Sequence, residues 1–129
     1  MKARKRPTRR TWKKSSPETV ERFGVVLPKS PAVERRTMFG YPCAFANGNM
    51  FAGLFGDDFF VRLPEAERVA FLTRKDGLPF EPTPGRVMKD YVLVGPELTA
   101  DEEALRALLR RALAQAKTLP EKRRLGGRR

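Results

Sequence analysis

The segment of residues 38–63, with the sequence MFGYPCAFANGNMFAGLFGDDFFVRL, decides the fold that we expect for this chain. Asn47-Gly48 lies near its middle, between two runs of alternating side chains. Asn-Gly is the dipeptide most typical of a two-residue hairpin loop, because a type I′ turn needs positive φ at both of its central residues. The segment is therefore predicted to form a three-stranded antiparallel meander, with a second turn within residues 56–58.

A loop at Asn47-Gly48 fixes which residues pair, and successive pairs point to opposite faces of the sheet. The predicted pairs are Ala46 with Asn49, Phe45 with Met50, Ala44 with Phe51, and Cys43 with Ala52. At the second turn, a loop of two residues and a loop of three residues are both possible. A loop of Asp57-Asp58 keeps Arg62 off the bulky face, as the cost of burying an unpaired charge requires, and pairs Leu54 with Val61 and Ala52 with Leu63. The predicted core face then consists of Tyr41, Cys43, Phe45, Met50, Ala52, Leu54, Phe59, Val61 and Leu63.

The opposite face of the meander is too aromatic for an ordinary solvent face. It is predicted to carry Ala44, Ala46, Phe51, Gly53, Phe55, Phe60 and Arg62. Two interpretations remain open: a terminal helix or the chain ends cover these rings, or the rings form a patch for self-association or for a partner. Under the second interpretation, the candidate interaction surface combines this face with the loop around Met38 and consists of Met38, Phe39, Gly40, Phe51, Phe55, Phe60 and Arg62.

The residues before the meander predict one helix and one strand. Ser16-Pro17 has a hydroxyl suited to an N-cap and a proline suited to the first helical position. An apolar stripe of Val20, Phe23 and Leu27 predicts a helix over residues 17–27 that packs through this side. A strand is expected over residues 33–39.

Two further helices and two strands are expected after the meander. Residues 64–73 predict a helix that buries Ala66, Val69 and either Ala70 or Phe71. Residues 79–83 and 91–94 are predicted to be extended, with a turn at Pro84-Gly85. Thr99-x-x-Glu102 matches a capping box and predicts the start of a last helix that lies across the sheet. Its apolar stripe consists of Leu105, Leu108, Leu109, Ala112, Leu113 and Ala116.

The net charge of +12 is concentrated at the two ends of the chain. Residues 1–16 hold eight basic residues and no acid, residues 120–129 hold five basic residues and one acid, and fourteen of each sign lie between them. Binding of nucleic-acid phosphates by these ends and a merely solubilising role both remain open. For Arg106, Arg110, Arg111 and Lys117 on the last helix, a nucleic-acid face and the ordinary placement of cations toward a helix C-terminus both remain open. The candidate nucleic-acid contacts are Lys2, Arg4, Lys5, Arg6, Arg9, Arg10, Trp12, Lys13, Lys14, Lys122, Arg123 and Arg124.

The residue types that most enzymes and metal sites rely on are scarce. The sequence contains no histidine and one cysteine, Cys43, which removes the common zinc ligand sets and any catalytic arrangement based on histidine. We expect Cys43 to be a buried thiol, and Asp57 and Asp58 to serve the turn. The expectation is a non-enzymatic protein with no cofactor and no metal. The lone cysteine, the absence of a long apolar run and the lack of an apolar segment at the start lead us to expect a cytoplasmic location without a membrane span.

Several short motifs occur in an order and spacing that resemble the N-terminal domain of the TfoX/Sxy family, bacterial regulators associated with natural competence. The motifs are RTMFG (36–40), FANGNMF (45–51), VRLP (61–64), PFEP (79–82), PGR (84–86), MKDY (88–91) and AKTLP (116–120). The resemblance covers roughly residues 17–120. It implies a two-layer α+β domain with one antiparallel sheet and the order α-β-β-β-α-β-β-α, and it carries no catalytic residues.

The chain is thus expected to consist of a disordered basic arm (1–16), one domain (17–119) and a basic tail (120–129). Our leading hypothesis is a non-enzymatic domain that acts through a protein partner or self-association, and the resemblance implies a link to transcriptional regulation. The alternative is a nucleic-acid-binding module that uses its basic ends.

Overall fold

The protein is an α+β domain built on one antiparallel sheet, as predicted. The computed structural model describes residues 14–38, 40–74 and 76–121. Within them, six strands form a single sheet in the order β1-β2-β3-β4-β6-β5. The strands are β1 (Glu34–Met38), β2 (Tyr41–Ala46), β3 (Asn49–Phe55), β4 (Asp58–Arg62), β5 (Gly77–Pro79) and β6 (Tyr91–Val94). The helices are α1 (Pro17–Val26), α2 (Glu65–Thr73), α3 (Pro96–Ala100) and α4 (Glu102–Thr118).

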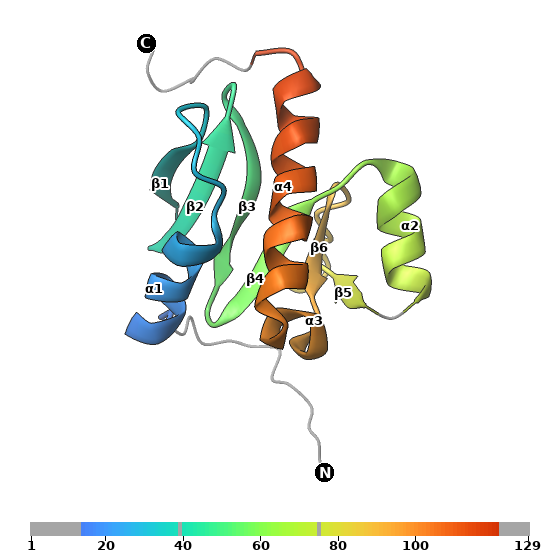
Figure 1. The fold of residues 1–129 in the computed structure, drawn as a ribbon. Helices are drawn as coiled ribbons and strands as arrows, with labels where there is room; N and C mark the ends of the chain where they lie inside the picture. Colours follow the sequence, from blue (N-terminus) through green and yellow to red (C-terminus); the bar gives the residue numbers. More distant parts are fainter. Residues whose placement is uncertain (1–13, 39, 75, 122–129) are drawn as a thin grey trace.

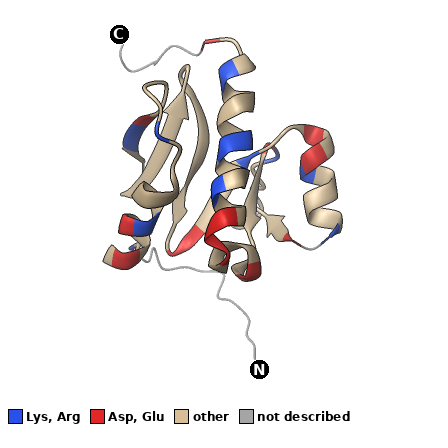
Figure 2. Ribbon diagram, in the orientation of Figure 1, with Lys and Arg blue, Asp and Glu red and all other residues tan. Residues whose placement is uncertain are grey.

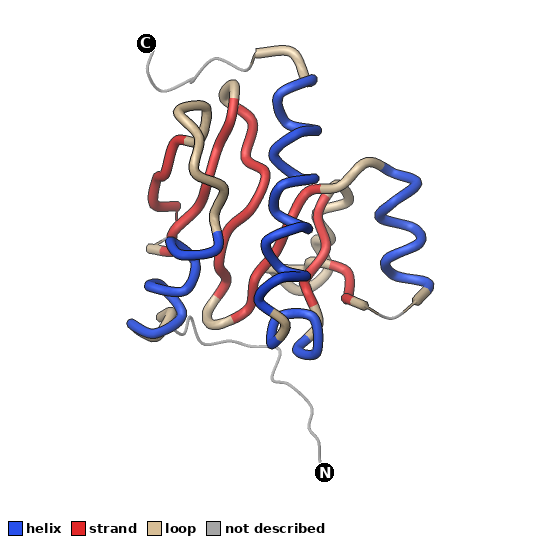
Figure 3. Tube along the Cα trace, viewed as in Figure 1, coloured by secondary structure: helices blue, strands red, loops and turns tan. Residues whose placement is uncertain are grey.

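The element order departs from the implied one at two places. Four strands rather than three precede α2, and the short helix α3 precedes α4. Figures 1 and 3 show α1 and α4 lying over the same face of the sheet, which we call the front face, with α2 beside β5 and β6. The two-layer arrangement therefore matches the prediction.

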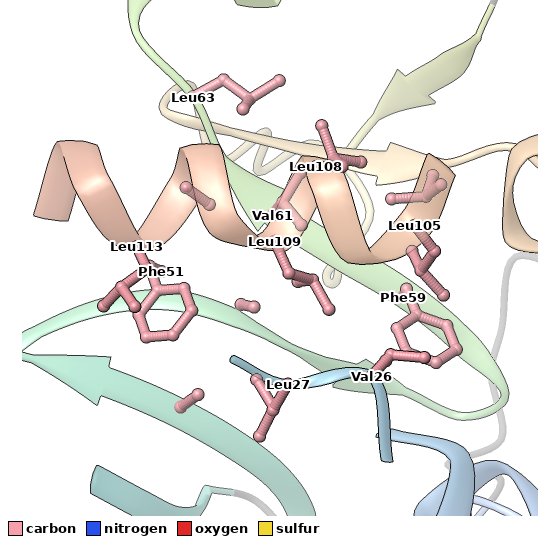
Figure 4. Packing of buried hydrophobic residues seen from close by; sticks show 14 of the residues in the cluster. Val26, Leu27, Phe51, Phe59, Val61, Leu63, Leu105, Leu108, Leu109 and Leu113 are labelled. Carbon is pink, nitrogen blue, oxygen red and sulfur yellow. The ribbon is translucent and has the colours of Figure 1, made fainter. Parts of the chain in front are cut away.

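The main core lies between the front face and the two long helices. Phe51, Leu54, Phe59 and Val61 point into it from the sheet, where each is at most 2% exposed. The predicted stripe of α4 is confirmed, because all six of its members are buried. Figure 4 shows leucines of this stripe packed above the sheet, next to Val26 and Leu27 from the end of α1.

The Asn47-Gly48 hairpin forms as predicted, but a bulge changes the pairing beyond it. Asn47 and Gly48 have φ values of 58° and 78°, and Phe45 pairs with Met50. The next pair joins Ala44 to Ala52, so β3 has one extra residue, Phe51, between two paired positions. Compared with a regular pairing, a bulge of this kind moves every side chain on one side of it to the opposite face of the sheet.

The predicted core face was therefore wrong in part. Tyr41, Cys43, Phe45 and Met50 lie on the other face of the sheet, which we call the back face, whereas Ala44, Ala46 and Phe51 lie in the main core. Beyond the bulge the prediction is confirmed for Ala52, Leu54, Phe59, Val61 and Leu63.

The second turn has a two-residue loop, as predicted, but at Gly56-Asp57 rather than Asp57-Asp58. Phe55 pairs with Asp58, Leu54 with Phe59 and Ala52 with Val61. Gly56 has a φ of 62°, and positive φ at the first loop position is typical of a type II′ hairpin. The pairing differs from the prediction by two residues, an even shift that leaves each side chain on its expected face.

Two details of the helices also differ from expectation. On α2, Ala66 is exposed and Val69 is 55% exposed, while Phe71 is buried. At the start of α4 the N-cap is Asp101 rather than Thr99, because Pro96 starts a separate short helix and the chain turns at Asp101. The Asp101 carboxylate accepts a hydrogen bond of 3.1 Å from the Ala104 N–H, and the Thr99 hydroxyl donates to the Gly95 carbonyl instead.

The hairpin turns at the two ends of β3 bind the segments where the chain enters and leaves the domain. At one end of β3, the Ser15 hydroxyl donates to the Gly56 carbonyl, and the Ser16 N–H donates to the Asp57 carboxylate over 2.8 Å. At the other end, the side-chain amides of Asn47 and Asn49 donate to the carbonyls of Leu119 and Pro120, each over 3.0 Å. The chain therefore enters and leaves the domain at opposite ends of the sheet (Figure 1).

Candidate interaction surface

The back face of the sheet carries a second apolar cluster to which no helix within the described residues contributes. Its buried members are Cys43, Met50, Phe60 and Phe80, and half-buried members surround them: Met38, Phe45, Phe55, Met88, Tyr91 and Leu93. Residues 80–90, which we call the strap, connect β5 to β6 without regular structure and supply Phe80 and Met88. The back face is thus covered by one irregular segment, whereas helices cover the front face.

The centre of the cluster depends on a glycine. Gly53 pairs with Phe60, and a Cβ atom at Gly53 would lie 2.6 Å from Cζ of Phe60 and 3.1 Å from Sγ of Cys43. The missing side chain therefore leaves the space that the Phe60 ring fills. Phe80 stacks on this ring with a centroid distance of 4.4 Å and an interplanar angle of 14°. Phe55 meets Phe80, and Tyr91 meets Phe60, in edge-to-face contacts.

The strap is held at few points. The Met88 N–H donates to the Phe80 carbonyl over 2.8 Å, and the predicted turn at Pro84-Gly85 is present, with a φ of 83° at Gly85. Next to the strap, the Tyr91 hydroxyl donates to the Met50 carbonyl over 3.0 Å. Burial raises the pKa of Tyr91, with a smaller lowering from Arg62, so the phenol stays protonated and remains a donor. Phe80 is the one fully buried side chain of the strap.

Paired charges flank the cluster. The Arg36 guanidinium donates to both carboxylate oxygens of Glu34 over 3.0 Å and lies over the Phe45 ring at 4.4 Å. Arg62 lies 3.5 Å from the Asp90 carboxylate. Arg36 and Arg62 therefore each have an acidic neighbour, and these two pairs add no net charge to the flanks.

One row of side chains crosses the whole back face, and it is open at the β5 end. The strand pairing aligns Arg36, Cys43, Gly53, Phe60, Leu93 and Leu78 in this order from β1 to β5. Phe60 is 3% exposed, whereas Leu78 is 62% exposed. An exposed leucine at the end of a buried aromatic row extends the apolar surface to the edge of the sheet.

Cys43 lies in this row as the buried, inert thiol that we expected. Burial raises its pKa from 9.0 to about 11, against a smaller lowering by a backbone hydrogen bond at Met38. The thiol is thus protonated at neutral pH, and a protonated thiol is a poor nucleophile.

Truncating Phe80, the buried side chain of the strap, should expose the Cys43 thiol. We expect Phe80→Ala to raise the labelling rate of Cys43 by an aromatic disulfide reagent about tenfold or more, because the ring that covers Phe60 is lost and the strap opens more often. Val87→Ala is the matched control, since Val87 is on the strap and is 49% exposed. An unchanged rate in Phe80→Ala would mean that the strap does not limit access to the back face.

The structure distributes the predicted interaction residues over different environments. Met38, Phe55 and Arg62 are half-buried on the back face, and Gly40 is exposed with a φ of 84°. Phe60 is on the back face but is buried beneath Phe80, so it is not part of an exposed patch. Phe51 is 0% exposed in the main core beneath α4, and assigning it to this surface was wrong because of the bulge. Phe39 lies outside the described residues.

The predicted nucleic-acid contacts lie almost wholly outside the described residues. Lys14 is described and exposed. The other candidates are not described: Lys2, Arg4, Lys5, Arg6, Arg9, Arg10, Trp12, Lys13, Lys122, Arg123 and Arg124. For these eleven, the nucleic-acid role stays a prediction. The same holds for the proposed arm and tail boundaries.

The sequence did not lead us to assign Phe80, Leu78, or the β6 side chains Tyr91 and Leu93 to the back face. Tyr91 and Leu93 alternate with the buried Val92 and Val94, which indicates two different apolar environments on the two faces of this strand. That alternation was the available signal for a second cluster. Nothing local to Phe80 indicates which ring it meets, because Phe60 is far away in the sequence.

Two absences apply to the described part of the chain. None of its groups of His, Cys, Asp and Glu side chains is arranged to hold a metal ion. None of its helices is both long enough and apolar enough to cross a membrane.

Comparison with known proteins identifies the family. Comparison with curated proteins finds no match to this chain. The family model described as the TfoX N-terminal domain matches residues 26–116, most of the described fold from the end of α1 to near the end of α4. The matched part includes all six strands, the strap, the whole back-face cluster and all of the main core except the residues of α1 before Val26. The chain therefore belongs to the TfoX N-terminal domain family.

Proposed function

We propose that this chain is a non-enzymatic regulatory domain that acts through protein contacts, and that the open end of the back face pairs with a second copy of the chain. The observation that carries the proposal is the row that runs from buried Phe60 through half-buried Leu93 to Leu78, which is 62% exposed. Transcriptional regulation is the process that the family suggests, and a cytoplasmic location is part of the same proposal.

A non-enzymatic role is supported by the residues available for chemistry. The sequence contains no histidine, and Cys43 is held in its protonated form by burial. The aromatic groups of the back face pack against each other, and the Tyr91 hydroxyl is engaged with the Met50 carbonyl. These groups are arranged for packing rather than for proton transfer or nucleophilic attack.

A second copy is the occupant that the charges favour. The flanks carry the Arg36–Glu34 and Arg62–Asp90 pairs, so they offer both signs of charge in balance. A two-fold interface places one patch against its own copy, and a patch with one dominant sign would repel itself. Face-to-face packing of two sheets through apolar side chains is also a common arrangement in proteins.

Leu78→Asp tests this proposal. The wild-type chain is expected to form a concentration-dependent dimer in sedimentation velocity measurements, and Leu78→Asp is expected to weaken it at least about tenfold, because a two-fold interface contains the new carboxylate twice. The fold should be retained, since Leu78 is largely exposed.

Val69→Asp is the matched control for this experiment. Val69 is 55% exposed on α2 and belongs to neither apolar cluster, so the same charge there should leave the dimer intact. A wild-type chain that stays monomeric up to about 1 mM would overturn self-association. Equal weakening by both variants would assign the effect to net charge rather than to the back face.

A further inference from the structure

The sheet ends in two edge strands, β1 and β5, and the two edges differ in how well they are protected. β5 has three residues and includes a proline, Pro79. β1 has five residues, contains no proline and pairs with β2 without a bulge. Among the described elements, only β2 packs extensively along β1, which lies at the outer side of the sheet in Figure 1. An edge of this length without a covering element can accept a further strand.

The hairpin of β1 and β2 determines which backbone groups of β1 point away from the sheet. In a hairpin with a two-residue loop, the residues that flank the loop form a hydrogen-bonded pair, and hydrogen-bonded and non-hydrogen-bonded pairs then alternate along the strands. Met38 pairs with Tyr41 across such a loop, so the backbone groups of Met38 and Arg36 point toward β2. The N–H and C=O groups of Arg35 and Thr37 therefore point outward.

The hairpin of β2 and β3 leads to the same assignment. Ala46 and Asn49 flank its loop, so Ala46 and every second residue before it direct their backbone groups toward β3. Pro42 is one of these residues; it has no N–H to donate, and the β2–β3 pairing ends before it. The residues between them face β1, in agreement with the first hairpin. Within the described part of the chain, the outward groups of Arg35 and Thr37 form no hydrogen bond.

The β5 edge offers a new strand much less. The Gly95 N–H donates to the Asp76 carbonyl over 2.8 Å, so Gly77 and Pro79 are the residues of β5 whose backbone groups point outward. Pro79 has no N–H, and Gly77 is buried against the Phe71 ring of α2. Strand addition is therefore favoured at β1 rather than at β5.

The side chains of β1 indicate which charge a pairing strand should carry. Figure 2 shows the two basic residues of β1 at the outer side of the sheet, and Glu34, on the back face, already neutralises Arg36. Arg35 is exposed on the front side, with its Cζ atom 5.6 Å from the centroid of the Phe23 ring, and it forms no ion pair with any described residue. An acidic side chain directly opposite Arg35 would be stabilising.

A second copy of β1 fits this edge less well than an acidic strand does. Antiparallel pairing of two copies can join Arg35 to Arg35, Arg35 to Thr37, or Thr37 to Thr37. The first arrangement places the two Arg35 residues opposite each other and the second does so for the two Arg36 residues, and like charges in direct opposition are destabilising. The third arrangement places no acid opposite Arg35. The charges of β1 thus favour a strand from a different chain.

We propose that the β1 edge at Arg35 and Thr37 binds an extended acidic segment of a partner protein as an added antiparallel strand. Hydrogen bonds to the outward backbone groups supply affinity, and the acid that faces Arg35 supplies specificity. Met38, half-buried at the margin of the back-face cluster, favours apolar side chains on the other face of the bound segment. β1 and β5 lie at opposite edges of the sheet, so this site goes beyond the back-face dimer and does not depend on it.

The test of charge uses the full-length chain and two blocked, dye-labelled peptides of about eight residues, one alternating Val with Glu and the other alternating Val with Lys. Binding is measured by fluorescence anisotropy at ~150 mM salt. The Val/Glu peptide is expected to bind about fivefold more tightly than the Val/Lys peptide. Arg35→Glu should abolish this preference, whereas Arg86→Glu, the same change at an exposed residue of the strap, should retain it.

The test of strand addition removes one outward hydrogen-bond donor. Thr37→Pro should weaken binding of the Val/Glu peptide at least about tenfold, because it removes the Thr37 N–H and places a ring at the edge. The fold should be retained, as thermal unfolding can verify, since this N–H takes no part in the pairing with β2. Thr37→Val keeps the donor and should bind like the wild-type chain.

A further measurement leaves the protein unchanged. In the bound strand, the Glu residues opposite Arg35 and Thr37 direct their amides toward β1, whereas the Val residues direct theirs away from it. N-methylation of the Glu amides should therefore abolish binding, and N-methylation of the Val amides should leave it largely intact.

Other outcomes overturn the assignment. No binding of the Val/Glu peptide up to about 1 mM would remove the strand-binding site. Equal effects of methylation at Glu and at Val would place the peptide away from the β1 edge, and equal effects of Arg35→Glu and Arg86→Glu would assign the preference to net charge. If Thr37→Pro dissociated a wild-type dimer in sedimentation velocity measurements, the β1 edge would belong to a second copy of the chain instead.

Discussion

Phe51→Ala is expected to lower the free energy of unfolding by about 3–5 kcal/mol, the range typical of a deleted aromatic side chain in a packed core. Phe51 is 0% exposed, and Figure 4 shows its ring beneath α4, in the cluster that includes Leu113 and Leu109. The bulge in β3 is what turns this ring to the front face. Urea unfolding of the variant, followed by circular dichroism, measures the loss.

Phe55→Ala is the control that makes this result specific. Phe55 is half-buried on the back face, where it meets Tyr41 and Phe80 at the margin of the second cluster. Its truncation should cost clearly less, because a partly exposed ring loses less apolar contact. If strict alternation held through β3 without a bulge, Phe51 would lie on the same face as Phe55 and the two variants would cost similar amounts. That result would contradict the register.

The parts of the fold that could be predicted are those that local residues determine. The Asn47-Gly48 loop requires positive φ, and Ser16-Pro17 supplies both an N-cap and a suitable first helical residue. The stripe of α4 repeats with the helical period from Leu105 to Ala116, so its buried side could be assigned without knowing its neighbours. In each case the signal and the structure that it specifies lie within the same few residues.

The bulge at Phe51 could not be predicted in this way. Both Met50 and Phe51 are large and apolar, so neither residue type indicates which of them points to the helices. Two different apolar environments accept them, one under α4 and one under the strap. When both faces of a sheet are apolar, alternation no longer distinguishes inside from outside, and tertiary packing decides the register.

The candidate surface was predictable only in outline for the same reason. An aromatic second face was expected from the sequence, and the structure has one, but its composition depends on Phe80, which comes from a segment without regular structure. The stacking of Phe80 on Phe60 joins residues twenty positions apart through a space that exists because Gly53 has no side chain. No periodic pattern encodes a contact of this kind.

Gly77→Ala is expected to destabilise the domain by about 3 kcal/mol, the upper part of the usual range for an overpacked site. A Cβ atom at Gly77 would overlap the Leu93 carbonyl oxygen and the ring of Phe71. The carbonyl cannot rotate away as a side chain would, because β5 and β6 are paired at Leu78 and Leu93. The ring is 2% exposed and fixes α2 against the sheet. Relief of the overlap would therefore require β5 or α2 to move, and stability is measured by urea unfolding.

Gly24→Ala is the control, because the group nearest to its new Cβ atom is the end of a side chain that can move. In α1, the new Cβ would lie 3.0 Å from Nη1 of Arg35, the end of a flexible side chain. The gain in helix propensity, about 0.5–1 kcal/mol, offsets the partial loss of the contact between Arg35 and the Phe23 ring, so the net change should be close to zero. A Gly77→Ala protein as stable as Gly24→Ala would mean that α2 and β5 are not packed as closely as the structure has them. The strap, which begins directly after β5, would then lack the rigid attachment that holds Phe80 over the back face.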